Sequence, residues 1–406
     1  MKALNGQWIA VALIVSLALA ARAGANDFFN VTASGSGGTT VTDSSGNIIH
    51  LTNNLITLNG GFFALAGQNV TSSLSWGGVP NAMILTENAA QTQATLTFPT
   101  TGFHEVFNGA SGSDLQNQIQ NFNKGDGERA YAQFLKSMDQ LSPVATLDGN
   151  PQASTALIAG DMFNRFGVEN QQQTETRSNS GGSYFGIDAV GGYDRAAGLD
   201  GNWIDLSFDT GARFGSNVAL DFGTTLAYRE VGGSEAYTVA EEVALPITFI
   251  NNSGDGLSWQ VAPWAFAGLS ASYDQASGGL LIGGGGTSSL ALHLGTLTIT
   301  LGNQIEYTGN VDVSVSGYTF DTDIDQWILM DGLDARFRFP GTPLLVEGSI
   351  SYDNFLNKAA VPNYWAPTLG FGIALGRHSK LTLSYAGDFG KNYNNNGALL
   401  ELVLAY

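Results

Sequence analysis

The side chains that could do acid–base or metal chemistry are scattered along this sequence of 406 residues. The histidines are His50, His104, His293 and His378. None of them has a second histidine or a carboxylate at the spacing that a zinc site or a catalytic triad requires. They are therefore expected in loops or inside a barrel, and no metal site or histidine-based catalytic site is predicted.

A glycine run, Gly283 to Gly286, is the next candidate, because glycine-rich loops cradle phosphate groups. A phosphate-binding loop continues into a Lys-Ser/Thr pair and a helix. Here Thr287-Ser288-Ser289 leads into another stretch with strand-like alternation. The glycine run is therefore predicted to belong to a strand, and no cofactor is predicted.

Charged residues in the last part of the chain alternate with apolar ones. Because successive strand side chains point to opposite faces, the charges are predicted to line one side of a sheet. They are Asp205, Asp209, Arg213, Asp221, Arg229, Asp334, Arg336, Arg338, Glu347 and Glu401. A lattice of salt bridges, with the aspartates beside Arg213 and Arg229, is the favoured interpretation. A hydrolase or protease site on the same face is the alternative, but no enzyme is predicted.

Residues 183–406 consist of such alternating stretches, separated by turns such as Leu199-Asp200-Gly201-Asn202. About 13 stretches can be counted, and those between Tyr318 and Phe339 are taken as one long strand. About 12 strands are predicted, since single-chain bacterial barrels close with an even number.

The last stretch, Gly397 to Tyr406, has one fully apolar face that includes Leu400, Leu402, Leu404 and Tyr406. Its length fits the roughly 9–11 residues that a tilted strand needs to cross a bilayer. Taken alone, the stretch also fits the edge strand of a soluble sandwich. The strands before it favour a closed membrane barrel, which leaves no sheet edge in the lipid.

The N-terminus and the composition agree with export. Lys2, the apolar run from Trp8 to Ala21 and the small residues after it are typical of a secretory signal peptide, with cleavage expected after Ala25. The net charge of −19 argues against nucleic acid as a partner. Only 13% of residues are charged and cysteine is absent, which suits a β-rich protein that crosses a membrane unfolded.

The mature chain divides into four regions by its patterns: 26–112, 113–167, 168–182 and 183–406. The first alternates short apolar runs with turn residues, for example at 48–52, 55–58, 70–76 and 94–98. A small sandwich or a few rungs of a β-solenoid is predicted there. Residues 168–182 are rich in Gln, Asn, Thr and Ser and are predicted to be a polar tether.

Apolar residues in 113–167 recur every three to four positions, which predicts helices. The first is expected to be capped by Ser113, and the second to end at Ser142-Pro143. The third is expected to begin at Asn150-Pro151, a capping residue followed by proline at the first helical position. The apolar stripes of these helices are expected to pack against one another.

This order of regions resembles the autotransporters, the type V secretion family of Gram-negative outer membranes. The residues that carry the resemblance are the export signal, the Asn/Thr/Gly-rich β region, the segment Met138-Asp139-Gln140-Leu141-Ser142-Pro143 and the terminal aromatic strand. The resemblance implies a barrel in the outer membrane that is inserted by the barrel assembly machinery. That machinery would read Leu400, Leu402, Leu404 and Tyr406, and a helix would thread the pore.

The sequence therefore predicts a mainly β protein with a C-terminal transmembrane barrel, preceded by a short helical segment and a small N-terminal β region. The favoured function is an autotransporter-like anchor for a short surface module, as a monomer in contact with outer-membrane lipid. A porin-like passive channel is the first alternative. A secreted soluble structural or binding β-protein is the second.

Overall fold

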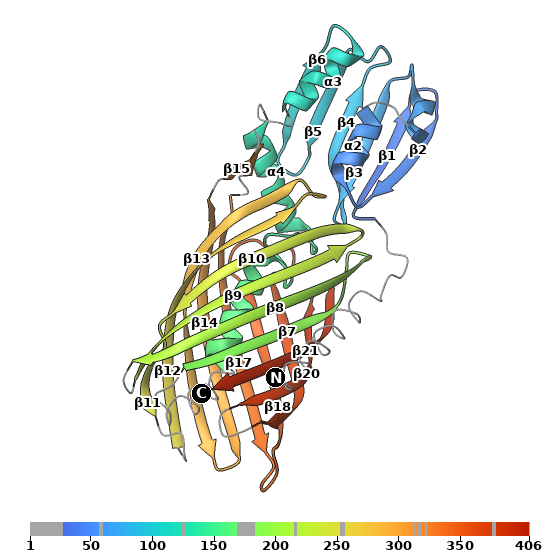
Figure 1. Ribbon diagram of the computed structural model, residues 1–406. Coiled ribbons are helices and arrows are strands. Elements are labelled where there is room, and N and C mark those ends of the chain that lie inside the picture. The colour runs from blue at the N-terminus through green and yellow to red at the C-terminus, as the bar shows by residue number, and fades with distance from the viewer. Residues whose placement is uncertain are drawn as a thin grey trace, which may run out of the picture.

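The computed structural model describes residues 27–56, 60–122, 127–168, 183–214, 217–251, 256–311, 313–315, 318–320, 323–375 and 379–405. The predicted signal peptide, the predicted tether except Val168, and Tyr406 lie outside these residues. The described chain forms a β-barrel with an N-terminal module on one end (Figure 1). Among the described helices, none combines the length and the hydropathy needed to cross a bilayer.

The N-terminal module, residues 27–141, is built on one antiparallel sheet of six strands in the order β2-β1-β3-β4-β5-β6. The prediction of a sandwich or a solenoid is wrong, because helices rather than a second sheet cover the apolar face. Strands at 70–76 and 94–98 are confirmed. The strands are β1 Phe29–Gly35, β2 Thr40–Ser45, β3 Val70–Trp76, β4 Val79–Glu87, β5 Gln93–Phe98 and β6 Phe103–Asn108.

The strands predicted at 48–52 and 55–58 are wrong, because residues Ile48–Ile56 form helix α2, followed by the 3₁₀ helix η1, Gly60–Leu65. Ile48, Leu51 and Leu55 are buried at a spacing of three and four residues, as on one helix face. The side chain of Asn47 caps this helix, since its Oδ1 accepts a hydrogen bond from the backbone N–H of His50 at 3.0 Å. Burial of one helical face outweighs the β-branched composition of the segment.

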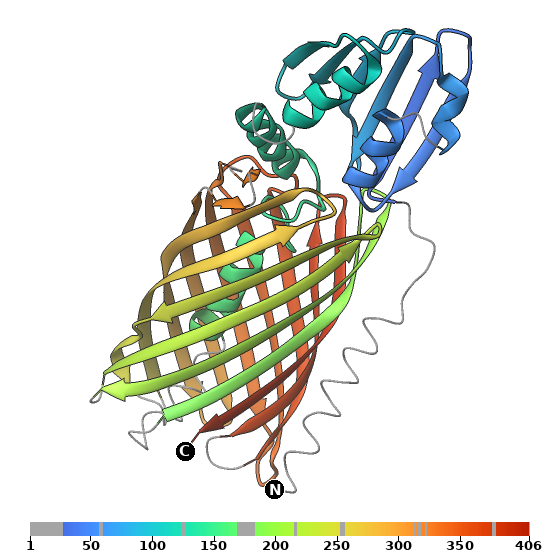
Figure 2. The ribbon, with the colours of Figure 1, turned by 45° about the horizontal axis from the view of Figure 1, so that its top comes forward.

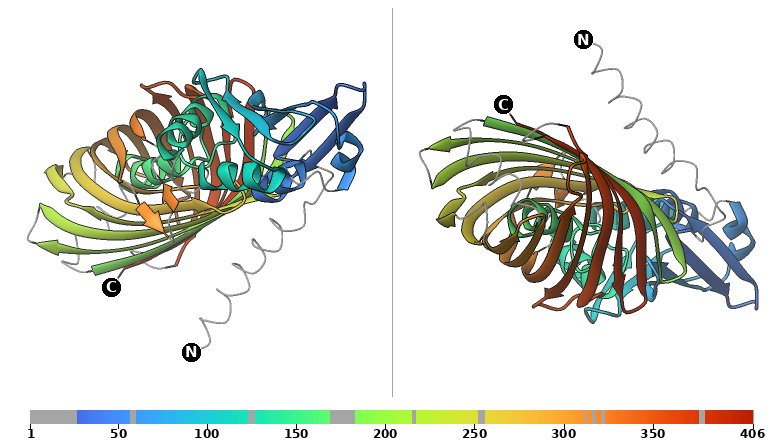
Figure 3. Two further views of the ribbon diagram at one scale, coloured as in Figure 1. Left: turned by 90° about the horizontal axis from the view of Figure 1, so that it is seen from above. Right: turned by 90° about the horizontal axis from the view of Figure 1, so that it is seen from below.

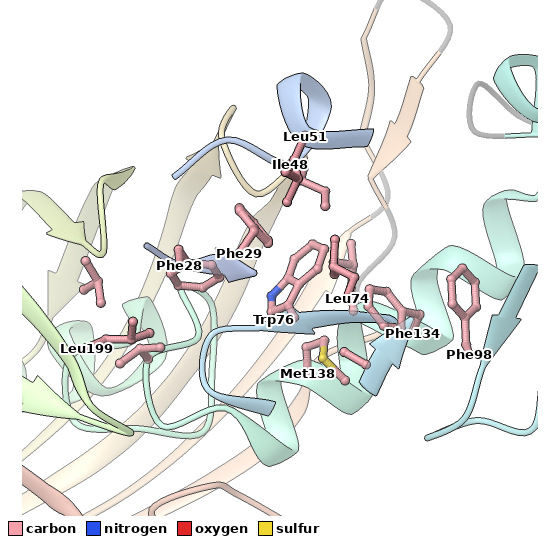
Figure 4. Close-up of a cluster of buried hydrophobic side chains, with 14 of the residues drawn as sticks. Phe28, Phe29, Ile48, Leu51, Leu74, Trp76, Phe98, Phe134, Met138 and Leu199 are labelled. Atoms are coloured by element: carbon pink, nitrogen blue, oxygen red, sulfur yellow. The ribbon is translucent and has the colours of Figure 1, made fainter. Parts of the chain in front are cut away.

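Two further helices complete the module: α3, Gly112–Asn121, and α4, Glu128–Leu141. Ser111, rather than Ser113, caps α3 by accepting from the N–H of Asp114. Phe134 of α4 packs against the sheet, with its ring centroid 5.2 Å from that of Trp76 and 4.6 Å from that of Phe98 (Figure 4). The expected packing of the three helices on one another is therefore wrong, because α4 packs on the sheet and the third helix lies elsewhere.

The barrel is a sheet of 13 strands in which β10 and β11 lie end to end between β9 and β12, so its wall has 12 positions (13 − 1). The predicted 12-stranded barrel is confirmed. It closes where β21 pairs with β7, with Ala405 opposite Tyr184. The strands are β7 Ser183–Ala196, β8 Leu199–Phe214, β9 Val218–Val231, β10 Ser234–Ala244, β11 Ile247–Asn251, β12 Gly256–Ser272, β13 Ser277–Leu294, β14 Leu297–Val311, β17 Asp325–Arg338, β18 Leu344–Phe355, β19 Asn363–Ala374, β20 Lys380–Gly390 and β21 Tyr393–Ala405.

The two ends of the barrel differ. The end that carries the module is called the upper end, and the barrel both begins and ends at the opposite, lower end (Figure 2). The short strands β15 Val313–Val315 and β16 Tyr318–Phe320 lie in the connection from Val311 to Asp325 at the upper end. This connection is the longest between neighbouring barrel strands. The third helix, α5 Ser154–Phe163, and the π-helical turn η3 Asn164–Val168 lie inside the barrel.

Candidate functional site

The barrel lumen is occupied by α5 and η3, which together are called the plug (Ser154–Val168). Views along the barrel show the helix surrounded by the wall (Figure 3). Most of its residues are buried, including Ala156, Ile158, Ala159 and Met162. A helix that is apolar nearly all round needs a surrounding protein wall, and the barrel supplies it.

Polar contacts join both ends and the middle of the plug to the wall. Near the upper end, the Ser154 hydroxyl lies 2.7 Å from the hydroxyls of Thr238 and Ser270. In the middle, Gln304 Nε2 donates to the carbonyl oxygen of Ala159 at 2.8 Å. These buried bonds come from β10, β12 and β14, so the plug has a defined depth and rotation in the lumen.

Arg165, in η3, forms a buried ion pair between the plug and the wall. Its Nη1 lies 2.5 Å from Oε2 of Glu242 on β10 and 3.2 Å from Oδ2 of Asp161 one helical turn earlier. Asp209 and Asp221 on the wall add to the negative potential at this guanidinium. A buried guanidinium among several carboxylates has its charge compensated in a region that excludes water.

Beside this ion pair, the plug packs on an apolar part of the wall, where Phe266 is the cross-strand neighbour of Glu242. Ile158, Met162 and Phe166 form one cluster with Trp264 and Phe266 of β12. These two rings point inward and lie against Gly285 and Gly283 of β13, where a side chain would collide with them. The glycine run is thus part of a strand, as predicted, and it makes room for large lumen side chains.

Two further glycines seat the plug directly. A Cβ atom on Gly332 of β17 would collide with the ring of Phe163, and one on Gly302 of β14 would meet the backbone of Gly167. Both positions therefore need the absence of a side chain for the plug to lie this close to the wall.

The chain between the module and the plug, Ser142–Ala153, closes the upper mouth and is called the neck. The Ser142 hydroxyl donates to the carbonyl oxygen of Gly77 at 2.7 Å, which ties the neck to the module. Asn150 does not cap α5, whose N-cap is Ala153. Its Nδ2 donates instead to Ala145 O at 2.7 Å, and its Oδ1 accepts from Gln152 N at 3.1 Å. Asn150 thus stabilises a turn, and the helix starts later than predicted.

Wall residues bind the neck from several sides. Arg229 Nη1 lies 3.3 Å from Asn150 Oδ1, while its Nη2 lies 2.5 Å from Asp194 Oδ2. Asp148 of the neck accepts from Thr155 at 2.8 Å and from Gln326 at 2.9 Å. Burial raises the pKa of Asp148, and it raises the pKa of Asp139 on α4 with a further contribution from the charge of Asp148. The mouth is therefore filled with paired polar groups.

A second charged lattice lies near the lower end. Arg336 on β17 lies 3.2 Å from Glu347 on β18, and Lys380 on β20 lies 3.6 Å from the same carboxylate. Lys380 also pairs with Glu401 on β21. This lattice links the strands β17, β18, β20 and β21 on the lumen side of the wall.

The structure brings most of the residues singled out in the sequence to the lumen, in separate groups. Those buried there are Asp205, Asp209, Asp221, Arg229, Asp334, Arg336, Glu347 and Glu401. Arg213 is half-buried near the lower end, and Arg338 is exposed at the end of β17. Arg165 of the plug adds positive charge beside Asp209 and Asp221, and Arg229 pairs with Asp194.

The histidines lie in unrelated places. His50 is exposed on α2 and His104 is exposed on β6. His293 is buried on the lumen side of β13, 3.0 Å from the Ser258 hydroxyl. His378 lies outside the described residues.

The barrel exterior carries an apolar belt between two levels of aromatic side chains. Tyr307 and Trp327 pack at the upper level, with centroids 5.0 Å apart, and Phe249 and Trp259 at the lower level, 4.8 Å apart. Tyr237 and Phe249 are 12 residues apart on β10 and β11. At about 3.3 Å per residue and a tilt of about 40°, they span about 30 Å along the barrel axis. This matches the hydrocarbon thickness of a bilayer, so the exterior is that of a membrane barrel rather than of a soluble β-protein.

The terminal strand follows the alternation derived from its sequence. Leu400, Leu402 and Leu404 lie on the outer face of β21, while Glu401 and Val403 are buried on the lumen side. Tyr406 lies outside the described residues. The expected pairing to the first strand near Tyr184 is made by Ala405.

The ion pair between Arg165 on the plug and Glu242 on β10 was not identified from the sequence. The available signal was Arg165 itself, the one cation in the largely apolar segment 154–168. Such a residue indicates a buried counter-ion. Glu242 gave no comparable signal, because it stands beside Glu241 and only the register assigns one to the lumen and the other to the exterior.

No family model matches the sequence, and no curated protein matches it. Among solved structures, the translocator domain of the autotransporter NalP from Neisseria meningitidis is 13% identical, with a TM-score of 0.41, over 62% of this chain and 98% of that one. The transport unit of the autotransporter AIDA-I from Escherichia coli is 10% identical, with a TM-score of 0.37, over 58% and 95%. An outer-membrane channel from Pseudomonas putida F1 is 12% identical, with a TM-score of 0.39, over 56% and 96%.

Proposed function

We propose that this protein is an outer-membrane anchor that holds its own N-terminal module at the outer face of the membrane. The observation that carries the proposal is the path of the chain. The module lies at the upper end, the neck and plug run through the lumen, and the first strand of the barrel begins at the lower end. A chain that follows this path places its module at one end of the barrel and both termini of the barrel domain at the other end.

The orientation follows from the barrel connections. In bacterial outer-membrane barrels, the longer loops are extracellular and the turns on the periplasmic side are short. The longest connection, from Val311 to Asp325, lies at the upper end together with the module. The upper end is therefore assigned to the cell exterior and the lower end to the periplasm.

The anchor works in this proposal by keeping the lumen closed after the module is outside. The neck fills the mouth, and the plug is bonded to several strands of the wall. Insertion by the barrel assembly machinery through the terminal strand (Leu400, Leu402, Leu404 and Tyr406), in monomeric form, belongs to the same proposal.

Single-cysteine labelling on intact cells tests this function, since the chain has no native cysteine. Thr71→Cys lies on the exposed face of the module, and Thr342→Cys lies in the lower turn between β17 and β18. A membrane-impermeant maleimide should label the first in intact cells and the second only after the outer membrane is permeabilised. The reverse pattern would contradict the orientation, and labelling of neither in intact cells would contradict surface display.

The porin-like channel remains the alternative, and it differs in one measurable property. A passive channel needs a continuous water path, whereas the proposed anchor keeps its lumen filled. Purified protein in planar bilayers should therefore pass almost no steady current if the anchor function is right. A stable current from the unmodified protein would favour the channel.

A further inference from the structure

Three turns at the upper end of the barrel contact the N-terminal module. They join β7 to β8 (197–198), β9 to β10 (232–233) and β12 to β13 (273–276), and together they are called the rim. The module stands on the rim in both side views (Figures 1 and 2). Domains of one chain move relative to one another unless their interface is large and hydrophobic. The contacts at the rim therefore decide whether the module is an independent unit.

Asp274, in the turn between β12 and β13, binds the start of helix α2. Its Oδ1 accepts from Asn47 Nδ2 at 2.8 Å, and its carbonyl oxygen accepts from Ile48 N at 2.9 Å. Its Oδ2 accepts from Glu235 N of β10 at 3.0 Å. Asn47 has two roles, since its Oδ1 caps α2 while its Nδ2 binds the barrel. Because a helix of nine residues is marginal without tertiary contacts, this connection supports the formation of α2.

The backbones of the module and the rim also approach each other closely. A Cβ atom on Gly46 of the module would collide with the backbone of Gly233. One on Gly78 would collide with the Cβ of Ala197. Both glycines of the module therefore need the absence of a side chain for it to lie this close to the barrel.

The apolar core of the module continues into the barrel. Phe28 is fully buried, and its N–H donates to the carbonyl oxygen of Gly232 at 2.8 Å. The cluster of buried side chains that contains Phe28 also contains Leu199 of β8 and Val231 of β9 (Figure 4). These two barrel residues are 4% and 2% exposed. The barrel therefore supplies part of the core to which the module belongs.

We propose that the rim completes the fold of the module, so that β1 and α2 are stable only while they are docked on the closed barrel. The module supplies the sheet and its covering helices. The barrel supplies the acceptors of Asp274 and part of the apolar cluster. The module and the barrel then form one cooperative unit.

This coupling has a consequence for export, which rests on the function proposed above. A module that lacks part of its core before the barrel closes does not complete its fold in the periplasm, because domains are only marginally stable. Completion of the fold and display at the outer face would then occur together.

Asn47→Ser separates the contact with the barrel from the helix cap, because serine caps helices as well as asparagine does but has no amide to donate to Asp274. In the full-length protein in detergent, hydrogen exchange of the α2 amides should be at least fivefold faster in this variant than in the wild type. In an Asp274→Ala background, the same substitution should change the rates less than twofold, because the partner is already absent. Asn69→Ser is the matched control and should leave α2 unchanged, since Asn69 Oδ1 accepts from Ala89 N within the module.

Leu199→Ala tests the coupling from the barrel side. It should make exchange of the β1 amides at least tenfold faster, although Leu199 belongs to β8. Leu344→Ala, at the lower end of β18, removes a leucine far from the rim and should leave β1 unchanged. The gel shift of unheated samples identifies the variants that keep a closed barrel.

Two outcomes would overturn the proposal: Leu199→Ala leaves the β1 rates unchanged in a closed barrel, or Asn47→Ser has the same effect with and without the Asp274 side chain. The module would then be an independently folded domain. If Leu199→Ala prevents barrel closure, the Asn47 and Asp274 variants decide alone. These measurements use purified protein, so the loss of coupling would leave surface display by the cell-labelling experiment intact, and reversed labelling would leave the coupling intact.

Discussion

Arg165 Nη1 lies 2.5 Å from Glu242 Oε2, and this ion pair joins the end of the plug to the barrel wall. Both side chains are almost fully buried. Buried ion pairs hold geometry more than they add net stability, because desolvation offsets most of their attraction. Loss of one partner alone is strongly destabilising, since it leaves an uncompensated buried charge.

Arg165→Met is expected to destabilise the folded barrel by about 3–5 kcal/mol, because Glu242 keeps its burial and loses its cation. Urea unfolding, followed by the gel shift of unheated samples, measures this change. The double variant Arg165→Met/Glu242→Gln should recover part of the loss.

The control for this prediction is Arg195→Met. Arg195 Nε lies 3.5 Å from Asp200 Oδ1 at an exposed site. Such a pair contributes at most about 1 kcal/mol. Equal shifts for Arg165→Met and Arg195→Met would show that the plug ion pair has no special role.

Replacement of residues 154–168 by a Gly/Ser linker of the same length is expected to open a conducting pore. The current should be cation-selective, because carboxylates dominate the described lumen face and include Asp205, Asp209, Asp221, Glu242, Asp334 and Glu401. Planar-bilayer recordings under a KCl gradient give the conductance and the reversal potential. An anion-selective or unchanged conductance would contradict this arrangement of lumen charges.

Glu87, at the end of β4, gives the module a pH dependence. Burial raises the pKa of its carboxyl group from 4.5 to about 7. The folded state therefore binds the proton more tightly than the unfolded state, so stability is highest below pH 4.5 and falls until about pH 7. Glu87→Gln should remove this fall and stabilise the module at pH 8.

Hydrogen exchange of the β3–β5 amides in the full-length protein at pH 5 and pH 8 measures this effect, after correction for intrinsic exchange. Asp43→Asn replaces an exposed carboxylate on β2 and serves as the control. It should leave the protection of these amides unchanged at both pH values. A wild-type module that is more stable at pH 8 than at pH 5 would contradict the expected direction of the pH dependence.

The terminal strand provides a paired test of the two faces of the wall. Leu400→Lys places a cation against lipid and should cost about 2–4 kcal/mol near the membrane midplane. Leu399→Lys points to the acidic lumen and should be tolerated better. The folded fraction of each variant in lipid vesicles, measured by gel shift, compares the two substitutions. Equal losses of folded protein would contradict the assignment of the two faces.

Removal of residues 400–406 tests the proposed assembly signal separately. The shortened chain is expected to reach the periplasm but not to insert, because the closing pairs between β21 and β7 are lost. Heat-modifiable barrel in the outer-membrane fraction would show that these residues are dispensable for assembly.

Much of the barrel followed from the sequence by itself, because strand periodicity is local. Leu400, Leu402 and Leu404 alternate with Glu401 and Val403, and this is enough to assign a lipid face and a lumen face. The same rule assigned Asp205 and Asp209 to the lumen face and the apolar residues beside them to the lipid face. The closed barrel followed from the need to leave no edge in the membrane, and the number 12 from the even strand counts of single-chain bacterial barrels.

Only the tertiary structure decided what fills the lumen and which charges meet. Arg165 and Glu242 are 77 residues apart, and nothing local links them until the plug is seated. The inward rings of Trp264 and Phe266 fit the same alternation as lipid-facing ones would, so periodicity could not assign them. At 48–56, burial of Ile48, Leu51 and Leu55 selected a helix over the strand that local composition favoured. Packing partners far away in the chain decide such cases, and a one-dimensional pattern does not contain them.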